Sequence, residues 1–145
     1  MKRVRGAVVI VENGKVALIE RVNEQGTYYV FPGGGVEAGE TVREAAVREA
    51  YEELGLTVQL GELLCTVHFK DDQHYFAARV VAGTFGTGKG EEFLSAEPEA
   101  GSYRPVWLPL AELAQRPVYP AHLAELIASN ALEGIEQPIV VDELG

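Results

Sequence analysis

The chain has 145 residues, enough for one ordinary domain with a single substantial core. Hydrophobic residues make up 47% of it and charged residues 23%, which excludes disorder as its main state. Its 12 Lys and Arg residues stand against 22 Asp and Glu, a net charge of −10. A nucleic-acid polymer is therefore not an expected partner, because binding it nonspecifically needs a basic surface.

The sequence predicts a cytoplasmic protein without a membrane segment. Its single cysteine, Cys65, excludes an intramolecular disulfide and fits a reducing compartment. The basic residues 1–5 precede an apolar run that Glu12 and Asn13 interrupt, so it is too short for a secretion signal. No run approaches the roughly 18 apolar residues of a membrane-spanning helix.

The first part of the chain predicts three strands. Residues 4–11 are β-branched and almost continuously apolar, as in a buried strand. The Asn13-Gly14 pair favours a tight turn into a second strand over 16–22, and the two strands form a hairpin. A third short strand is expected over 28–31.

A glycine run, Gly33–Gly35, follows Pro32. We expect it to be a loop whose backbone adopts positive φ and approaches a ligand closely. Because the run precedes a helix, its free N–H groups are also expected to face an anion.

The helix that follows has clear boundaries. Thr41 is the expected N-cap and Glu44 completes a capping box, while Gly55 is a natural terminator. Five residues are expected on its inner face: Ala45, Ala46, Ala50, Tyr51 and Leu54.

The rest of the chain predicts more strands and a terminal helix. We expect strands over roughly 57–69, 74–82 and 103–110, a helical turn over 111–114 and a helix over 121–132. A polar, glycine-rich segment spans 83–101. Together these elements indicate one α/β domain over 1–134, with a mixed sheet between helices, and an acidic tail over 135–145.

Three acids crowd the last two turns of the predicted helix. Glu49, Glu52 and Glu53 stand at i, i+3 and i+4, which places like charges on one face. They also lie at the helix end where the macrodipole disfavours negative charge. An acidic cluster is commonly only a solvated helix face. Here a hard cation such as Mg²⁺ would offset both the repulsion between the acids and their unfavourable place in the macrodipole, because it takes carboxylate oxygens as ligands.

Combined with the glycine run, the acids complete a longer pattern. Gly34, Glu40 and residues 48–56 match Gly-x5-Glu-x7-Arg-Glu-U-x-Glu-Glu-x-Gly-U, where U is a bulky aliphatic residue. Every fixed position is met, and Ala50 is the one departure, at the first aliphatic position. This pattern resembles the Nudix box, and the chain is similar to the MutT-like Nudix hydrolases over most of residues 4–130.

The resemblance implies a Nudix α/β/α sandwich with a mixed β-sheet, and hydrolysis of a nucleoside diphosphate linked to another group. It implies Mg²⁺ or Mn²⁺ as cofactor, held by Glu49, Glu52, Glu53 and the backbone carbonyl of Gly34. The metal neutralises the diphosphate and aligns a water molecule for attack at phosphorus.

The resemblance also implies roles around that cluster. Arg48 orients a glutamate through charge-assisted hydrogen bonds, and Glu40 pairs with it. Glu49, Glu52 and Arg48 are candidate catalytic residues. The general base varies within the family, and Glu92 is favoured among four acids of segment 83–101: Glu91, Glu92, Glu97 and Glu99.

The substrate stays open. Gly34, Gly35, Arg21 and Tyr75 are candidate substrate-binding residues. Dinucleoside polyphosphates, nucleotide sugars, ADP-ribose and noncanonical nucleoside triphosphates all fit the pattern. A nucleotide-sensing module without catalysis and an isomerase of allylic diphosphates are the alternatives. Whether the chain forms a homodimer is also open.

Overall fold

The computed structural model describes residues 3–68, 70–87, 102–129 and 139–141. Within them, one five-stranded sheet has the order β10-β6-β7-β1-β5. Its strands are β1 (Val4–Val9), β5 (Gly33–Gly35), β6 (Leu56–His68), β7 (Asp72–Gly83) and β10 (Ile139–Val141). The sheet is mixed, because β1 is parallel to β7 and β10 to β6, whereas the other pairs are antiparallel.

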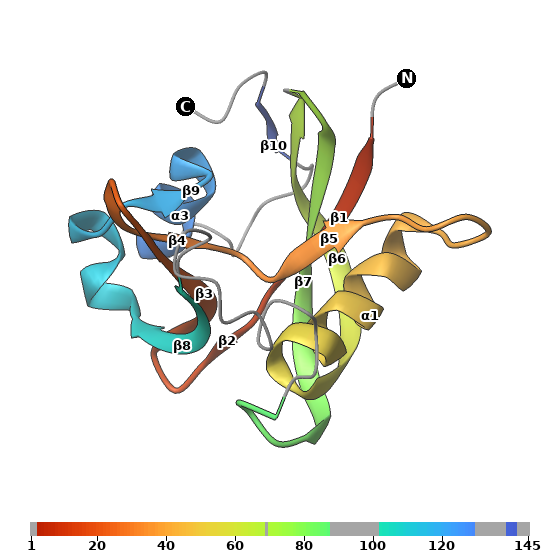
Figure 1. The fold of residues 1–145 in the computed structure, drawn as a ribbon, viewed down its shortest axis with the longest axis horizontal. Coiled ribbons are helices and arrows are strands. Elements are labelled where there is room, and N and C mark those ends of the chain that lie inside the picture. The colour runs from red at the N-terminus through yellow and green to blue at the C-terminus, as the bar shows by residue number, and fades with distance from the viewer. Residues whose placement is uncertain (1–2, 69, 88–101, 130–138, 142–145) are drawn as a thin grey trace.

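A second sheet packs beside the first (Figure 1). It has the order β2-β3-β4-β9, with β8 on the free side of β3. Its strands are β2 (Val11–Glu12), β3 (Lys15–Asn23), β4 (Gly26–Val30), β8 (Ser102–Pro109) and β9 (Val118–Tyr119).

Helices cover opposite sides of the two packed sheets (Figure 1). Helix α1 (Val42–Leu54) buries Ala46, Ala50 and Leu54 against Val8 and Ile10. On the other side lie α3 (Ala121–Ala128) and the 3-10 helix η2 (Leu110–Gln115). They share a core with Ala7 and Val9, so alternate residues of the first strand serve the two layers.

The fold class predicted from the sequence, α/β with a mixed sheet, is confirmed. The hairpin turn is also as expected, with positive φ at Asn13 (53°) and Gly14 (74°). Thr41 and Glu44 form the predicted capping box, and Gly55 ends α1 with a left-handed φ of 79°.

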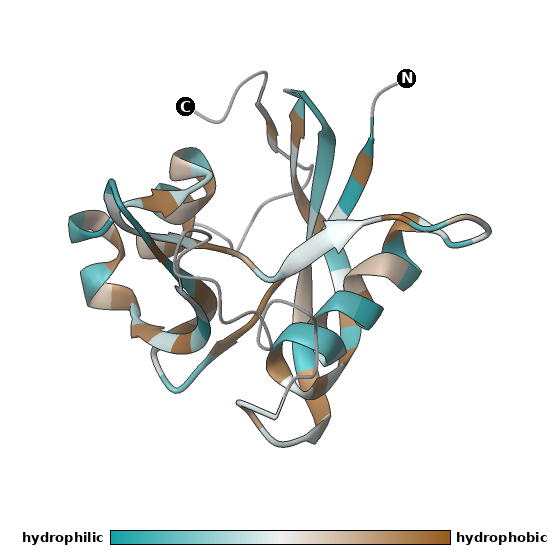
Figure 2. Ribbon diagram, in the orientation of Figure 1, coloured by the Kyte–Doolittle hydropathy of each residue, from teal (hydrophilic) through white to brown (hydrophobic). Residues whose placement is uncertain are grey.

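The predicted inner face of α1 is wrong at one residue, Tyr51. Tyr51 is 57% exposed, whereas Ala45, Ala46, Ala50 and Leu54 are buried. Teal and brown alternate along α1 in Figure 2, as expected for a helix with one buried stripe. Tyr51 lies just outside that stripe, which small alanines fill because α1 packs closely on β1. A Cβ on Gly6 would overlap the Val42 carbonyl oxygen.

The prediction that the glycine run is a loop with positive φ is wrong as well. Residues Gly33–Gly35 form strand β5, paired with β1, and none of them has a positive φ. The run faces the end of α1 rather than its start. Glycine is required there for close approach, since a Cβ on Gly33 would overlap Ala7.

Some of the remaining predicted segments lie partly or wholly outside the described residues. Residues 88–101, which hold most of the predicted polar segment, lie outside the described residues, as do residues 130–132 of the predicted terminal helix. Residues Ile139–Val141, within the expected acidic tail, pair with β6. In the described part of the chain, no helix is long and apolar enough to cross a membrane.

Candidate functional site

The predicted glycines and acids meet where β5 crosses the last two turns of α1. The Gly33 N–H donates to Glu53 Oε1 over 2.8 Å. Gly34 lies directly against the Glu49 carboxylate, which occupies the space that a Cβ would need. Absence of a side chain thus lets the backbone of β5 touch both carboxyl groups.

Glu53 is the most deeply buried acid of the site. It is 1% exposed, and the Tyr103 hydroxyl donates to its Oε2. Burial raises the pKa of Glu53 to about 8, and the charge of Glu49 adds to that rise, while the hydrogen bonds from Tyr103 and Gly33 oppose it. Burial also raises the pKa of Glu49, against the opposing effect of Arg48. The two carboxyl groups therefore resist being ionised together.

Arg48 holds the surrounding acids in place. Its Nε and Nη2 donate to both Glu40 oxygens, over 2.8 and 3.0 Å, and Nη2 also donates to the Gly35 carbonyl over 2.9 Å. Its Nη1 lies 2.9 Å from Glu49 Oε1 and 3.1 Å from Glu52 Oε2. These bonds raise the pKa of Arg48 and lower that of Glu40.

Glu52 is more exposed than Glu49 and Glu53. Its side chain is 41% exposed, and its carboxylate contacts Arg48. In the part of the chain that the structure describes, no three His, Cys, Asp or Glu side chains converge closely enough to form a metal site by themselves. Of the predicted ligands, the structure thus brings together Glu49, Glu53 and Gly34.

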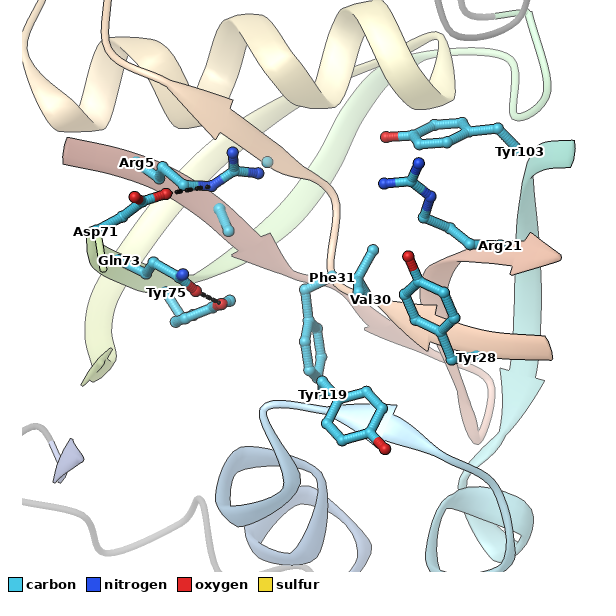
Figure 3. A pocket seen from close by; sticks show the side chains of 12 residues that line it. Arg5, Arg21, Tyr28, Val30, Phe31, Asp71, Gln73, Tyr75, Tyr103 and Tyr119 are labelled. Carbon is cyan, nitrogen blue, oxygen red and sulfur yellow. Dashed lines mark hydrogen bonds and ion pairs between the residues drawn. The ribbon is translucent and has the colours of Figure 1, made fainter. Parts of the chain in front are cut away.

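A pocket of about 260 Å³ opens beside this cluster. Gly33 and Tyr103 line it, and both also donate hydrogen bonds to Glu53, so the buried carboxyl group lies behind the pocket wall. Figure 3 shows two groups of polar side chains in it. One consists of Arg5, Asp71, Gln73 and Tyr75, and the other of Arg21, Tyr28 and Tyr103.

Two of the predicted substrate-binding residues, Arg21 and Tyr75, line the pocket. Tyr75 is buried, donates its hydroxyl to Gln73 Oε1 over 2.6 Å and meets the Phe31 ring edge to face. The other two, Gly34 and Gly35, lie outside the lining and contact Glu49 and Arg48 instead.

Arg21 is held between two aromatic rings. It faces Tyr103 of β8 and Tyr28 of β4 in the strand register, and its Cζ lies 4.9 and 6.0 Å from their ring centroids (Figure 3). Among the described residues, its guanidinium has no hydrogen bond or ion pair. Cation–π contacts leave the N–H groups at the edge of the guanidinium available to an anionic ligand.

Sequence reasoning missed the contact between Tyr103 and Glu53 and the pocket roles of Arg5, Asp71 and Gln73. No local signal marks them, because they lie on β1, β7 and β8, or just before β7 in the case of Asp71, and meet at the pocket only once the strands pair. The predicted base, Glu92, lies outside the described residues.

Known proteins resemble this chain over nearly its whole length. The family model of the NUDIX domain matches residues 2–129. The CTP pyrophosphohydrolase of Escherichia coli (strain K12) is 30% identical over 135 residues, 87% of this chain and 90% of that protein. The solved structure of the E. coli ORF135 protein superposes with a TM-score of 0.64 at 29% identity and covers 94% of each chain.

Other relatives match only in part. The ADP-ribose pyrophosphatase of Methanocaldococcus jannaschii is 47% identical over 58 residues, 39% of this chain and 34% of that protein. The chain spans from about a third to about half of the length of several such curated relatives. The matched domain and the relative that is aligned almost end to end show that the chain belongs to the NUDIX family.

Proposed function

We propose that this protein hydrolyses the diphosphate linkage of a nucleoside diphosphate joined to another group, with Mg²⁺ or Mn²⁺ as cofactor. The observation that carries the proposal is a carboxyl pair, buried Glu53 and partly buried Glu49, beside a pocket lined by Arg21, a cation without an acidic partner among the described residues. Two acids that could bind a divalent cation therefore lie beside an arginine that could bind a phosphate.

The donor set fits a hard divalent cation. Two carboxyl groups that resist joint ionisation gain most from such an ion, because it compensates both charges. Glu49, Glu53 and the Gly34 carbonyl are the groups that would hold it, with Glu52 as a further ligand. When bound, the metal would neutralise the diphosphate and acidify a water molecule.

The chain's own side chains would position the substrate. Arg21 would donate to a phosphate oxygen from a guanidinium already fixed by Tyr28 and Tyr103. Stacking on a nucleobase would fall to the pocket's aromatic rings. Arg48 would keep Glu49 and Glu52 oriented through its hydrogen bonds.

The names of the relatives bound the substrate class. One is named for CTP and another for ADP-ribose, and both molecules contain a nucleoside diphosphate joined to another group. CTP and ADP-ribose differ in the group attached to the nucleoside diphosphate, and also in the base. A panel of CTP, other nucleoside triphosphates, ADP-ribose, nucleotide sugars and dinucleoside polyphosphates therefore covers the class.

The test is turnover of this panel with Mg²⁺, with excess EDTA, and with Glu53→Gln. Turnover of at least one compound is expected with metal and none with EDTA or the variant. Glu44→Gln is the matched control, since glutamine also completes a capping box and Glu44 lies at the other end of α1. Full turnover in EDTA would contradict the mechanism, and tight binding without any turnover would favour a sensing module.

The general base is a separate proposal. If Glu92 is the base, Glu92→Gln should lower kcat by about 10²–10⁴-fold with little change in KM, since a base acts mainly in the transition state. The same substitution at Glu97 or Glu99 should be nearly silent. If all four loop glutamates, Glu91, Glu92, Glu97 and Glu99, prove dispensable, the base lies within the box, at Glu49 or Glu52.

A further inference from the structure

Tyr103 contacts both halves of the site. Its hydroxyl donates to Glu53 Oε2, while its ring lies over the guanidinium of Arg21 at 4.9 Å. It reaches both from β8, the strand that pairs with β3 and places Tyr103 directly opposite Arg21. One side chain therefore links the carboxyl group proposed to hold the metal with the cation proposed to hold the substrate.

The hydroxyl fixes the Glu53 carboxylate in a way that the backbone alone cannot. Gly33 donates to one oxygen and Tyr103 to the other. The terminal torsion of a glutamate is broad and soft, so the Gly33 bond alone defines the carboxylate orientation less closely than two bonds from different strands do. A carboxylate offers about four lone-pair sites, so acceptor capacity remains for a cation after both bonds form.

A second tyrosine–glutamate hydrogen bond, between Tyr29 and Glu20, differs from the Tyr103–Glu53 bond in the other donor to the carboxylate. On the neighbouring cross-strand row, the Tyr29 hydroxyl donates to Glu20 Oε2 over 3.1 Å, and Arg104 donates to Glu20 Oε1 over 2.7 Å. Glu20 is thus paired with a cation of the protein. The Gly33 N–H and the Tyr103 hydroxyl that donate to Glu53 are neutral, so they orient its carboxylate without cancelling its charge.

We infer that Tyr103 is a positioning residue that holds the Glu53 carboxylate for the divalent cation through its hydroxyl, and Arg21 for the substrate through its ring. This inference rests on the proposed function. It separates two effects that a merely structural tyrosine would combine: metal affinity depends on the hydroxyl, and substrate affinity depends on the ring.

The test is titration of the metal-free protein with Mn²⁺, followed by calorimetry, alongside KM measured at saturating metal. Tyr103→Phe should weaken Mn²⁺ binding by about tenfold, the lower end of the range for outer-shell partners of metal ligands. Its KM should stay within about twofold of wild type, because the ring over Arg21 is kept. Tyr103→Leu should weaken Mn²⁺ binding equally and also raise KM.

Two controls make the result specific. Tyr29→Phe removes the same kind of hydroxyl–glutamate bond away from the pocket and should leave Mn²⁺ affinity unchanged. In a double-mutant cycle, Tyr103→Phe should have no further effect on Mn²⁺ affinity in a Glu53→Gln background, because it acts through Glu53. All titrations are made at about 10 °C, below the range in which mesophilic domains melt, on variants with a cooperative melting transition. A Tyr103→Phe variant without such a transition would itself contradict a positioning role.

The outcomes distinguish the two proposals. If wild type binds Mn²⁺ and Tyr103→Phe binds it equally well, the inference is overturned while the proposed function stands. If wild type does not bind Mn²⁺, the proposed function fails first. If Tyr103→Phe instead raises KM as much as it weakens metal binding, the hydroxyl has no separate role and the inference is also overturned.

Discussion

The first turn of α1 contains groups that stabilise a helix start, whereas its last two turns contain groups that oppose a helix end. Thr41 and Glu44 exchange two hydrogen bonds in a capping box, with the acid near the positive end of the helix dipole. At the other end the last turn has no basic residue, and Glu53 is buried there next to Glu49. The same residue type, glutamate, is therefore stabilising at one end and costly at the other.

This difference separates residues selected for stability from residues selected for a ligand. Helix energetics explain Thr41, Glu44 and the left-handed φ of Gly55. They do not explain Glu53, a carboxyl group whose pKa burial raises to about 8. A buried acid whose donors are all neutral is expected where its charge is used, because evolution otherwise replaces it with an apolar side chain.

The largest expected effect is on activity at the C-terminal end. Glu53→Gln should lower kcat/KM by about 10³-fold or more, equivalent to about 4 kcal/mol of transition-state stabilisation. Glutamine fits the same space, and the Tyr103 hydroxyl can accept from its amide, so folding should survive. Steady-state turnover of the best substrate in the panel checks this. A loss of kcat/KM below tenfold would contradict a catalytic role for the acids at the C-terminal end of α1.

The next effect is on the pH dependence of stability without metal. Burial raises the pKa of Glu53 from the ordinary value of 4.5 to about 8, so its contribution to stability is full below pH 4.5 and is lost as pH rises towards 8. Metal-free wild type should lose on the order of 2–3 kcal/mol relative to Glu53→Gln between about pH 5 and about pH 8.5. Urea denaturation at the two pH values measures it, and parallel curves for both proteins would contradict it.

A smaller effect is expected at Arg48, which bridges the acids of the site. Arg48→Gln should reduce kcat/KM by about 10–100-fold, because Glu49 and Glu52 lose the donor that orients them. Glu40 loses its cationic partner too. Kinetics with increasing Mg²⁺ check whether added metal restores part of the loss. An inactive protein at every metal concentration would point instead to a direct contact of Arg48 with the substrate.

The smallest effect belongs to the N-terminal end. Thr41→Ala should lower the free energy of unfolding by about 1 kcal/mol, the usual loss for an N-cap, because the Glu44 N–H loses its acceptor. Turnover should stay within about twofold, since the cap lies at the opposite end of the helix. Chemical denaturation and a parallel activity assay measure both. A loss of activity larger than the loss of stability explains would remove the contrast between the two ends.

Much of this contrast is predictable from the sequence. The capping box, the Gly55 terminator and the hairpin at Asn13-Gly14 depend on local backbone chemistry, which a sequence shows directly. Glu49 and Glu53 both meet β5, as the spacing of i and i+4 on one helix face requires. The Nudix-box resemblance correctly indicates the family and the mixed α/β fold.

The errors and omissions arise where distant segments meet. The composition of the β5 glycines favours a loop, but pairing with β1 and contact with Glu49 require glycine for space instead. The prediction for Tyr51 is wrong because α1 buries a narrow stripe of alanines. Tyr103 cannot be assigned from the sequence, since its position opposite Arg21 depends on the register between β3 and β8.

The most direct test of the account is the melting temperature at about pH 8 with and without Mg²⁺, for wild type and Glu53→Gln. Mg²⁺ at about ten times its dissociation constant should stabilise wild type by about 1.4 kcal/mol, a rise of about 3–6 °C. Glu53→Gln should melt at or above metal-free wild type and should be stabilised by Mg²⁺ much less than wild type. A variant that melts clearly below metal-free wild type would contradict the account, because Glu53 would then be a structural residue.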